Sequence, residues 1–108
     1  FDDAGLFVRS VGLAGDSSGH FGRPKGVAVD RQGHIYVADG LFDVVQIFDQ
    51  EGRLLMDFGG AGQQAGEFWL PAGLAINAGG TLVVADSYNE RLQLFRVHPP
   101  TAPDGGAP

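Results

Sequence analysis

The sequence predicts an all-β fold that is built from one repeated unit. Three observations lead to this prediction. The chain repeats itself after 47 residues, each copy carries short stretches rich in β-branched and aromatic residues, and no stretch has the apolar period of an amphipathic helix. Each copy is therefore expected to fold as one small sheet of short strands.

The repeat is found by setting each residue against the one 47 positions later, and no gap is needed. Identical pairs include Phe21/Phe68, Pro24/Pro71, Gly26/Gly73, Ala28/Ala75, Gly33/Gly80, Val37/Val84, Ala38/Ala85, Asp39/Asp86 and Gln46/Gln93. Positions that differ often stay apolar, as in Val29/Ile76 and Ile35/Leu82. Variation of this kind is typical of core positions, so both copies are expected to have the same backbone.

Four strands are expected in the first full copy, at residues 26–30, 35–39, 44–48 and 54–58. Gly33 and Gly52 lie in the stretches between the first two and the last two strands, where glycine suits a tight hairpin turn. Apolar residues stand at adjacent positions within a strand, which predicts a sheet that is covered on both faces. Such sheets, repeated at this period, are typical of β-propeller blades.

The phase of the repeat divides the chain into four parts. Residues 1–12 align with the end of a copy and are expected to form the outer strand, or clasp, of another blade. Residues 13–59 form the first blade, and residues 60–97 form a second blade without its own outer strand. A tail rich in Pro and Gly follows at residues 98–108, and its prolines stand where that outer strand would run.

Several runs in both copies resemble the NHL repeat. They are residues 24–30, 33–39 and 45–49 in the first copy and residues 66–68, 71–76 and 84–95 in the second. The resemblance extends from residue 1 to about residue 97, and its motifs are specific to a fold rather than to a function. It implies six blades around a central channel and a domain that usually serves as a binding scaffold, with a minority of members acting as lyases.

Two blades do not close a ring, and their outer faces would expose large apolar patches. Either three identical chains supply the six blades that the resemblance implies, or the other blades belong to a longer chain. Closed cyclic symmetry favours the homotrimer, in which the strand of residues 1–12 crosses to the next subunit. Self-association is therefore expected, or association with other subunits of a complex.

The chain is acidic, with a net charge of −6 and a pI near 4.7. This charge opposes nucleic-acid phosphates and anionic lipids, and no apolar run reaches transmembrane length, so we expect neither nucleic-acid binding nor membrane insertion. Cysteine is absent, and thiols therefore do not indicate a compartment. Because the sequence begins with Phe1, a removed signal peptide and a periplasmic or secreted location stay open.

No catalytic residue is predicted. Residues 15–19 fit the G-x-S-x-G pattern of hydrolase nucleophiles, but their copy at residues 62–66 has no serine and neither segment precedes a helical pattern. The expected inner strands carry apolar residues such as Val27, Val29 and Leu74, which cannot transfer protons. No cofactor is expected.

Metal ligation is considered at three positions. Asp39 and Asp86 could ligate calcium or accept hydrogen bonds from backbone donors, and their recurrence in both copies favours the second role. His20 is the candidate metal ligand, because its copies in a trimer could converge near the axis. The alternative for His20 is a solvated loop histidine.

The places where the two copies differ indicate where function lies. The first copy has Leu41 and Phe42 in the loop after its second strand, and the second copy has Trp69 and Leu70 in the loop before its first strand. These loops, with Tyr88, are expected on one face of a propeller, where exposed aromatic residues favour a partner surface. The alternative is that Phe42 and Trp69 turn inward and plug the space between blades.

The predicted function is a non-catalytic, protein-binding scaffold that uses this loop face, as suits a subunit of a larger assembly. The alternative is a lyase-like enzyme, or a propeller that binds a small ligand or a metal in its central channel.

Overall fold

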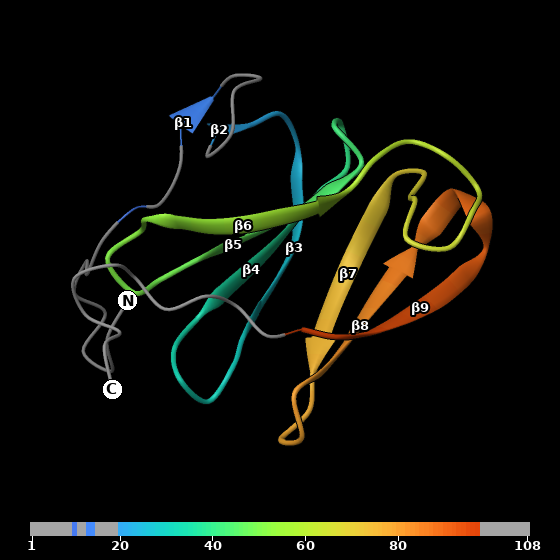
Figure 1. The fold of residues 1–108 in the computed structure, drawn as a ribbon. Helices are drawn as coiled ribbons and strands as arrows, with labels where there is room; N and C mark the ends of the chain where they lie inside the picture. The colour runs from blue at the N-terminus through green and yellow to red at the C-terminus, as the bar shows by residue number, and fades with distance from the viewer. Residues whose placement is uncertain (1–9, 11–12, 15–19, 98–108) are drawn as a thin grey trace.

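The described part of the chain forms two antiparallel sheets. In the computed structural model of the 108-residue chain, the structure describes residues 10, 13–14 and 20–97. The first sheet has the strand order β3-β4-β5-β6 and the second the order β7-β8-β9, as Figure 1 shows. A short parallel pair, β1 (Leu13–Ala14) and β2 (His20–Phe21), precedes them. The all-β prediction is confirmed.

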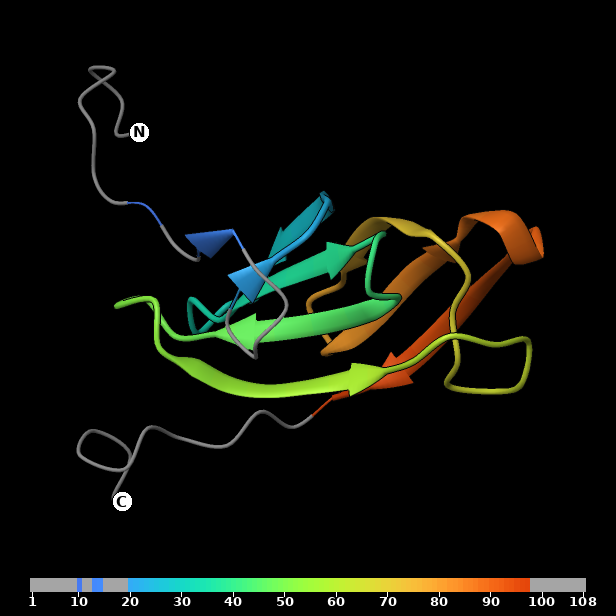
Figure 2. The same cartoon turned by 90° about the horizontal axis from the view of Figure 1, so that it is seen from above.

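The strands of the first sheet lie close to where the sequence predicts them. They are β3 (Pro24–Val29), β4 (Ile35–Asp39), β5 (Val44–Phe48) and β6 (Leu54–Gly59), and their order can be followed in Figure 2. Strand β3 begins two residues before the predicted start, at a proline that needs no ladder donor in the first position. It ends one residue earlier than predicted because Asp30 belongs to the turn.

The second sheet repeats the register of the first. Its strands are β7 (Pro71–Ile76), β8 (Thr81–Asp86) and β9 (Arg91–Arg96), with the short 3₁₀ helix η1 (Ser87–Asn89) between the last two. Val27 pairs with Val37 in the first sheet, and their counterparts Leu74 and Val84 pair in the second. The 47-residue repeat in sequence is therefore a repeat in structure.

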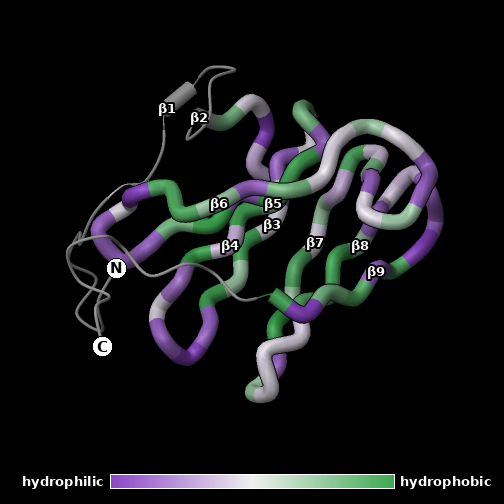
Figure 3. Tube along the Cα trace, viewed as in Figure 1, coloured by the Kyte–Doolittle hydropathy of each residue, from purple (hydrophilic) through white to green (hydrophobic). Residues whose placement is uncertain are grey.

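Both sheets have the same turn between their first two strands. The Asp30 carboxylate accepts the backbone N–H groups of Gln32 and His34, and its counterpart Asn77 accepts those of Gly79 and Thr81. Gly33 and Gly80 have φ angles of 88° and 86°, a conformation that costs glycine little. Figure 3 shows the first of these turns as a hydrophilic segment between hydrophobic strands. Asp30 and Asn77 therefore form the same turn in the two copies.

The core lies between the two sheets. Its buried residues come from both, namely Tyr36, Val45 and Ile47 of the first sheet, Leu82 and Val84 of the second, and Phe68 of the connecting loop. Strands β3 and β7 run side by side at the inner edge of this interface, as Figure 1 shows. Their approach is close at Gly26, where a Cβ atom would overlap the carbonyl oxygen of Ala72.

Several predicted features fall outside the described residues. These are the outer strand expected at residues 1–12, apart from residue 10, the serine motif of residues 15–19 and the tail of residues 98–108. Within the described part, no helix has the length and apolar character needed to cross a membrane.

Candidate functional site

Three loops meet at one end of the two sheets. They are residues 40–43 between β4 and β5, residues 60–70 between β6 and β7, and residues 87–90 between β8 and β9. The antiparallel registers place the ends of these strands at the same edge, since Asp39 pairs with Val44 and Asp86 pairs with both Pro71 and Arg91. We call this end of the molecule the loop face.

The buried carboxylate of Asp86 organises the loop face of the second sheet. Its oxygens accept the Trp69 backbone N–H at 2.7 Å, the Arg91 Nε at 2.8 Å and the Asn89 Nδ2 at 2.9 Å. Gln93 donates a fourth, longer bond at 3.2 Å. All four donors are protein groups, so Asp86 has the hydrogen-bonding role and its oxygens do not need a calcium ion.

The same side chains hold the long loop of residues 60–70. Asn89 donates to the carbonyl oxygen of Gly62, and Arg91 donates to the carbonyl oxygens of Gln64 and Glu67. Gln93 also donates to the Glu67 carbonyl oxygen, at 2.7 Å. Charged and amide donors that reach several backbone carbonyls fix the loop relative to the sheet.

The charge of Asp86 is stabilised by these donors. Burial raises the pKa of the Asp86 carboxyl. The Trp69 N–H, the Asn89 amide and the Arg91 guanidinium together lower it by more than burial raises it, so the pKa lies below its ordinary value. Asp86 is therefore ionised at neutral pH and holds the aromatic residue Trp69 in place through its backbone.

The first sheet uses the equivalent aspartate differently. Phe42 and Val44 stand where Asn89 and Arg91 stand in the second copy, and they cannot donate from their side chains. The Asp39 carboxylate instead accepts backbone N–H groups, from Gly22, Arg23, Leu41 and Phe42. The prediction that Asp39 accepts bonds from the turn after its strand is confirmed, and the donors before β3 are an addition that the sequence did not indicate.

The five predicted contact residues all lie on the loop face. Leu41, Trp69 and Tyr88 are exposed, whereas Phe42 and Leu70 are half-buried. The rings of Trp69 and Tyr88 pack edge to face with centroids 5.3 Å apart. The Tyr88 N–H also donates to the Trp69 carbonyl oxygen at 3.1 Å, so the pair is joined through backbone and side chain.

Leu70 has an unusual backbone conformation at the centre of this face. Its φ angle is 52°, in the left-handed region that non-glycine residues rarely adopt. Its N–H donates to the Asp43 carboxylate at 2.7 Å, a bond that joins the two sheets. Strain held by a specific bond is common at binding sites. Beside Leu70, Trp69 and Tyr88 line an open cavity of about 390 Å³ together with Gln63, Asn89, Glu90 and Arg91.

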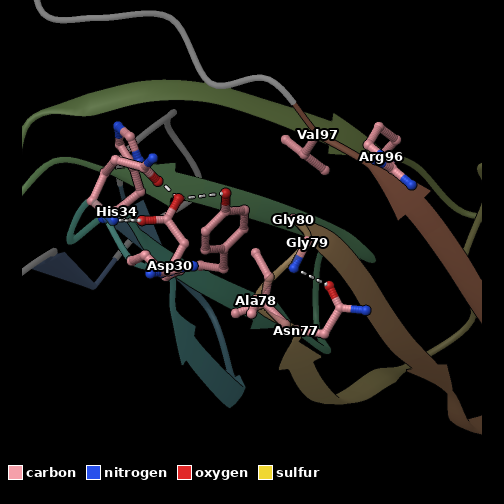
Figure 4. Close-up of a pocket in the computed structure, with 12 residues that line it drawn as sticks. Asp30, His34, Asn77, Ala78, Gly79, Gly80, Arg96 and Val97 are labelled. Atoms are coloured by element: carbon pink, nitrogen blue, oxygen red, sulfur yellow. Dashed lines mark hydrogen bonds and ion pairs between the residues drawn. The ribbon is translucent and has the colours of Figure 1, made fainter.

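A second cavity, of about 650 Å³, lies between the sheets at the opposite end (Figure 4). Asp30 and His34 line one side of it and Arg96 and Val97 the other, with residues 77–80 along the base. The Asp30 carboxylate accepts a hydrogen bond from the Tyr36 hydroxyl at 3.0 Å and lies 2.8 Å from the Nδ1 of His34. This cluster was not expected from the sequence, although Asp30, His34 and Tyr36 all belong to the β3–β4 hairpin and its turn.

The groups of this cluster satisfy one another. Burial raises the pKa of Asp30, but bonds from His34 and from the Tyr36 hydroxyl lower it by more, so the carboxylate stays charged. Burial and the neighbouring Asp30 charge raise the pKa of Tyr36 above its ordinary value. Tyr36 is buried and its protonated hydroxyl donates a hydrogen bond to Asp30, which makes it a structural donor rather than an acid or base for catalysis.

The proposed metal ligand His20 has its backbone in β2, and its side chain lies outside what the structure describes. Among the described residues, no group of three or more His, Cys, Asp or Glu side chains is arranged to hold a metal ion. The position of His20 as a ligand therefore stays a prediction.

The comparison with protein families agrees with the geometry. The model of the NHL repeat matches residues 21–43 and 68–95, which contain β3 and β4 of the first sheet, β7 and β8 of the second, and β9 except for its last residue. The chain therefore contains two NHL repeats, and these repeats indicate a β-propeller-type protein-interaction domain. A comparison with curated proteins finds no match.

Proposed function

We propose that the chain is a non-catalytic scaffold that binds another protein through its loop face, as a subunit of a larger assembly. The observation that carries this proposal is the exposed Trp69 and Tyr88 pair, held by the Asp86 network beside an open cavity. Large aromatic residues on a rigid support are typical anchors of protein interfaces, because little conformational entropy is lost when they bind.

Several side-chain hydrogen bonds hold the loop that carries Trp69. Asn89, Arg91 and Gln93 each contact both the Asp86 carboxylate and a carbonyl oxygen of the 60–70 loop. The other face residues extend the apolar surface toward the first sheet through Leu70 and Leu41. Such a surface is available to a partner without rearrangement of the backbone.

The enzymatic alternative has less support. A reaction in a central channel would need proton donors, acceptors or metal ligands on the inner strands β3 and β7. Lys25 is the single ionisable side chain in these two strands. The aspartates of the site are engaged by protein donors, and we therefore place the function in binding.

The proposal is tested in two steps. The purified chain, with a photo-crosslinker at exposed Leu41, first captures a partner protein. The identified partner is then titrated with the wild-type chain and with its variants, and the affinities are compared. The Trp69→Ser/Tyr88→Ser double variant should weaken partner binding by at least about tenfold, the usual effect of losing a hot-spot anchor. Trp69→Phe, which keeps an aromatic ring, and Arg31→Ser, at the opposite end of the sheets, are the matched controls. Equal affinity of the double variant and the wild type would contradict the proposal.

A further inference from the structure

The two sheets contact each other through unlike faces. The first sheet contributes Ala28, Tyr36, Val45, Ile47, Met56 and Phe58, which we call its leading face. The second sheet contributes Leu74, Ile76, Leu82, Val84 and Phe95, which we call its trailing face. Because the sheets are copies of one unit, the second sheet also has a leading face and the first also has a trailing face.

The leading face of the second sheet is apolar but uncovered. Val45 and Ile47 of the first sheet are 0% exposed, whereas their counterparts Leu92 and Leu94 are 65% and 66% exposed. Large side chains that are buried in one copy and exposed in the other indicate a contact that the described residues do not make with one another.

The trailing face of the first sheet is open at its inner strand β3, although Val37 and Phe48 on the same face are only 7% and 1% exposed. Leu74 and Ile76 of the second sheet pack against the core, whereas their counterparts Val27 and Val29 are 62% and 57% exposed. The chain thus exposes apolar residues of a leading face, on the second sheet, and of a trailing face, on the first sheet. These are the two kinds of face that meet between its own sheets.

The glycines of the inner strands point to the same conclusion. Gly26 has to be glycine because a Cβ atom there would overlap the Ala72 carbonyl oxygen of the next sheet. Its counterpart Gly73 faces open space, where a Cβ atom would have Ala85 as its nearest contact at 3.5 Å. Nothing within the described chain requires glycine at residue 73, but a second β3 packed there would require it.

The charges across the contact are also complementary. Within the chain, Asp43 of the first sheet binds the backbone N–H of Leu70 at the edge of the second. The counterparts of these two residues are Glu90 and Arg23, which would meet across a second contact of the same kind. In the described part of the chain neither side chain forms an ion pair, and opposite charges at this point favour the pairing.

We propose that a second copy of this chain packs its trailing face, with Val27 and Val29, on the leading face that carries Leu92 and Leu94. The contact is head-to-tail and repeats the contact between the two sheets within one chain. A repeated head-to-tail contact forms a ring where its rotation closes and a filament where it does not, so the mass of the assembly distinguishes the two. Glu90 borders both this contact and the loop-face cavity, but the Trp69 and Tyr88 side chains are not among the residues from which the contact is inferred, so the loop-face variants should still associate.

The test is the mass of the purified chain by sedimentation velocity and native mass spectrometry, over about a hundredfold range of concentration. The wild type should associate. Gly73→Ala should remain folded, since residue 73 has room and a normal φ angle, and should shift association to concentrations at least about tenfold higher. The matched change Gly26→Ala should instead lower the melting temperature of the chain itself.

Leu94→Asp provides a second variant in case Gly73→Ala alters folding, because Leu94 is exposed in the single chain. It should give a folded monomer with an unchanged circular-dichroism spectrum. A wild-type chain that stays monomeric over the whole range would overturn the proposal and would indicate that further blades of the same polypeptide cover these faces. Association of Gly73→Ala and Leu94→Asp at wild-type concentrations would overturn it as well.

Discussion

Asp39 and Asp86 show how one residue type can hold two different loops. Both carboxylates end the second strand of their sheet, and both are fully buried. Among the residues that the structure describes, Asp39 accepts bonds from backbone N–H groups alone, whereas Asp86 accepts bonds from three polar side chains and one backbone N–H. The difference arises because Phe42 stands where the second copy has Asn89, and a phenylalanine side chain cannot donate a hydrogen bond. The network with side-chain donors is therefore the one that holds Trp69.

Asp86→Asn should lower the free energy of unfolding at pH 7 by about 1–3 kcal/mol, because it removes a buried charge with four donors. The folded-state pKa of Asp86 lies below its ordinary value of 3.8. The carboxylate therefore stabilises the fold above that value, and this contribution is lost as the pH falls through the lowered pKa.

Urea unfolding at pH 7 and at about pH 3 measures this effect. The wild type should lose more stability between the two pH values than Asp86→Asn does. Asp30 and Asp49 also have lowered pKa values, so part of the acid sensitivity should persist in the variant. Asp57→Asn, at an exposed position of β6, is the control and should behave as the wild type does. Equal pH dependence in wild type and Asp86→Asn would refute the assigned role.

At the scale of the elements, each sheet is fastened by an aromatic pair that repeats with the sequence. Phe21 and Phe48 pack edge to face at 5.6 Å, and their counterparts Phe68 and Phe95 do so at 5.9 Å. Phe58 of the first sheet adds contacts with Phe68 at 6.2 Å and with Phe95 at 5.0 Å. The second pair therefore also joins the two sheets.

Phe68→Ala should destabilise the chain by about 3–5 kcal/mol, the usual cost of removing a fully buried phenylalanine. Phe21→Ala should cost clearly less, because Phe21 is half-buried and contacts the first sheet. Thermal and urea unfolding of the two variants provide the comparison. A smaller loss for Phe68→Ala than for Phe21→Ala would show that the connecting loop does not fasten the sheets together.

The strands and their order could be predicted from the sequence because they depend on local alternation, turn residues and the repeat. Strands β4 and β5 begin and end where the pattern predicts. The bonds of the loop face could not be predicted, since Asn89 and Arg91 reach carbonyls more than twenty residues away. The Asp30 cluster could not be predicted for a related reason, since the side chains of His34 and Tyr36 reach the second oxygen of Asp30 only once the hairpin has formed.

At the scale of the whole molecule, the two sheets leave apolar side chains exposed on each side, along β3 of the first sheet and β9 of the second. Val27 and Val29 lie on one of these faces, and Leu92 and Leu94 lie on the other. Each open face is the repeat copy of a face that is buried within the chain. We therefore expect the contact between the two sheets to be repeated between molecules.

The most direct test of this claim is to mix two variants that each keep one face. Val27→Asp/Val29→Asp keeps the leading face, and Leu92→Asp/Leu94→Asp keeps the trailing face. Each variant alone should be monomeric, and an equimolar mixture should form a 1:1 dimer that grows no further, as native mass spectrometry would show. A mixture that stays monomeric while the wild type associates, or a variant that associates alone, would contradict the claim.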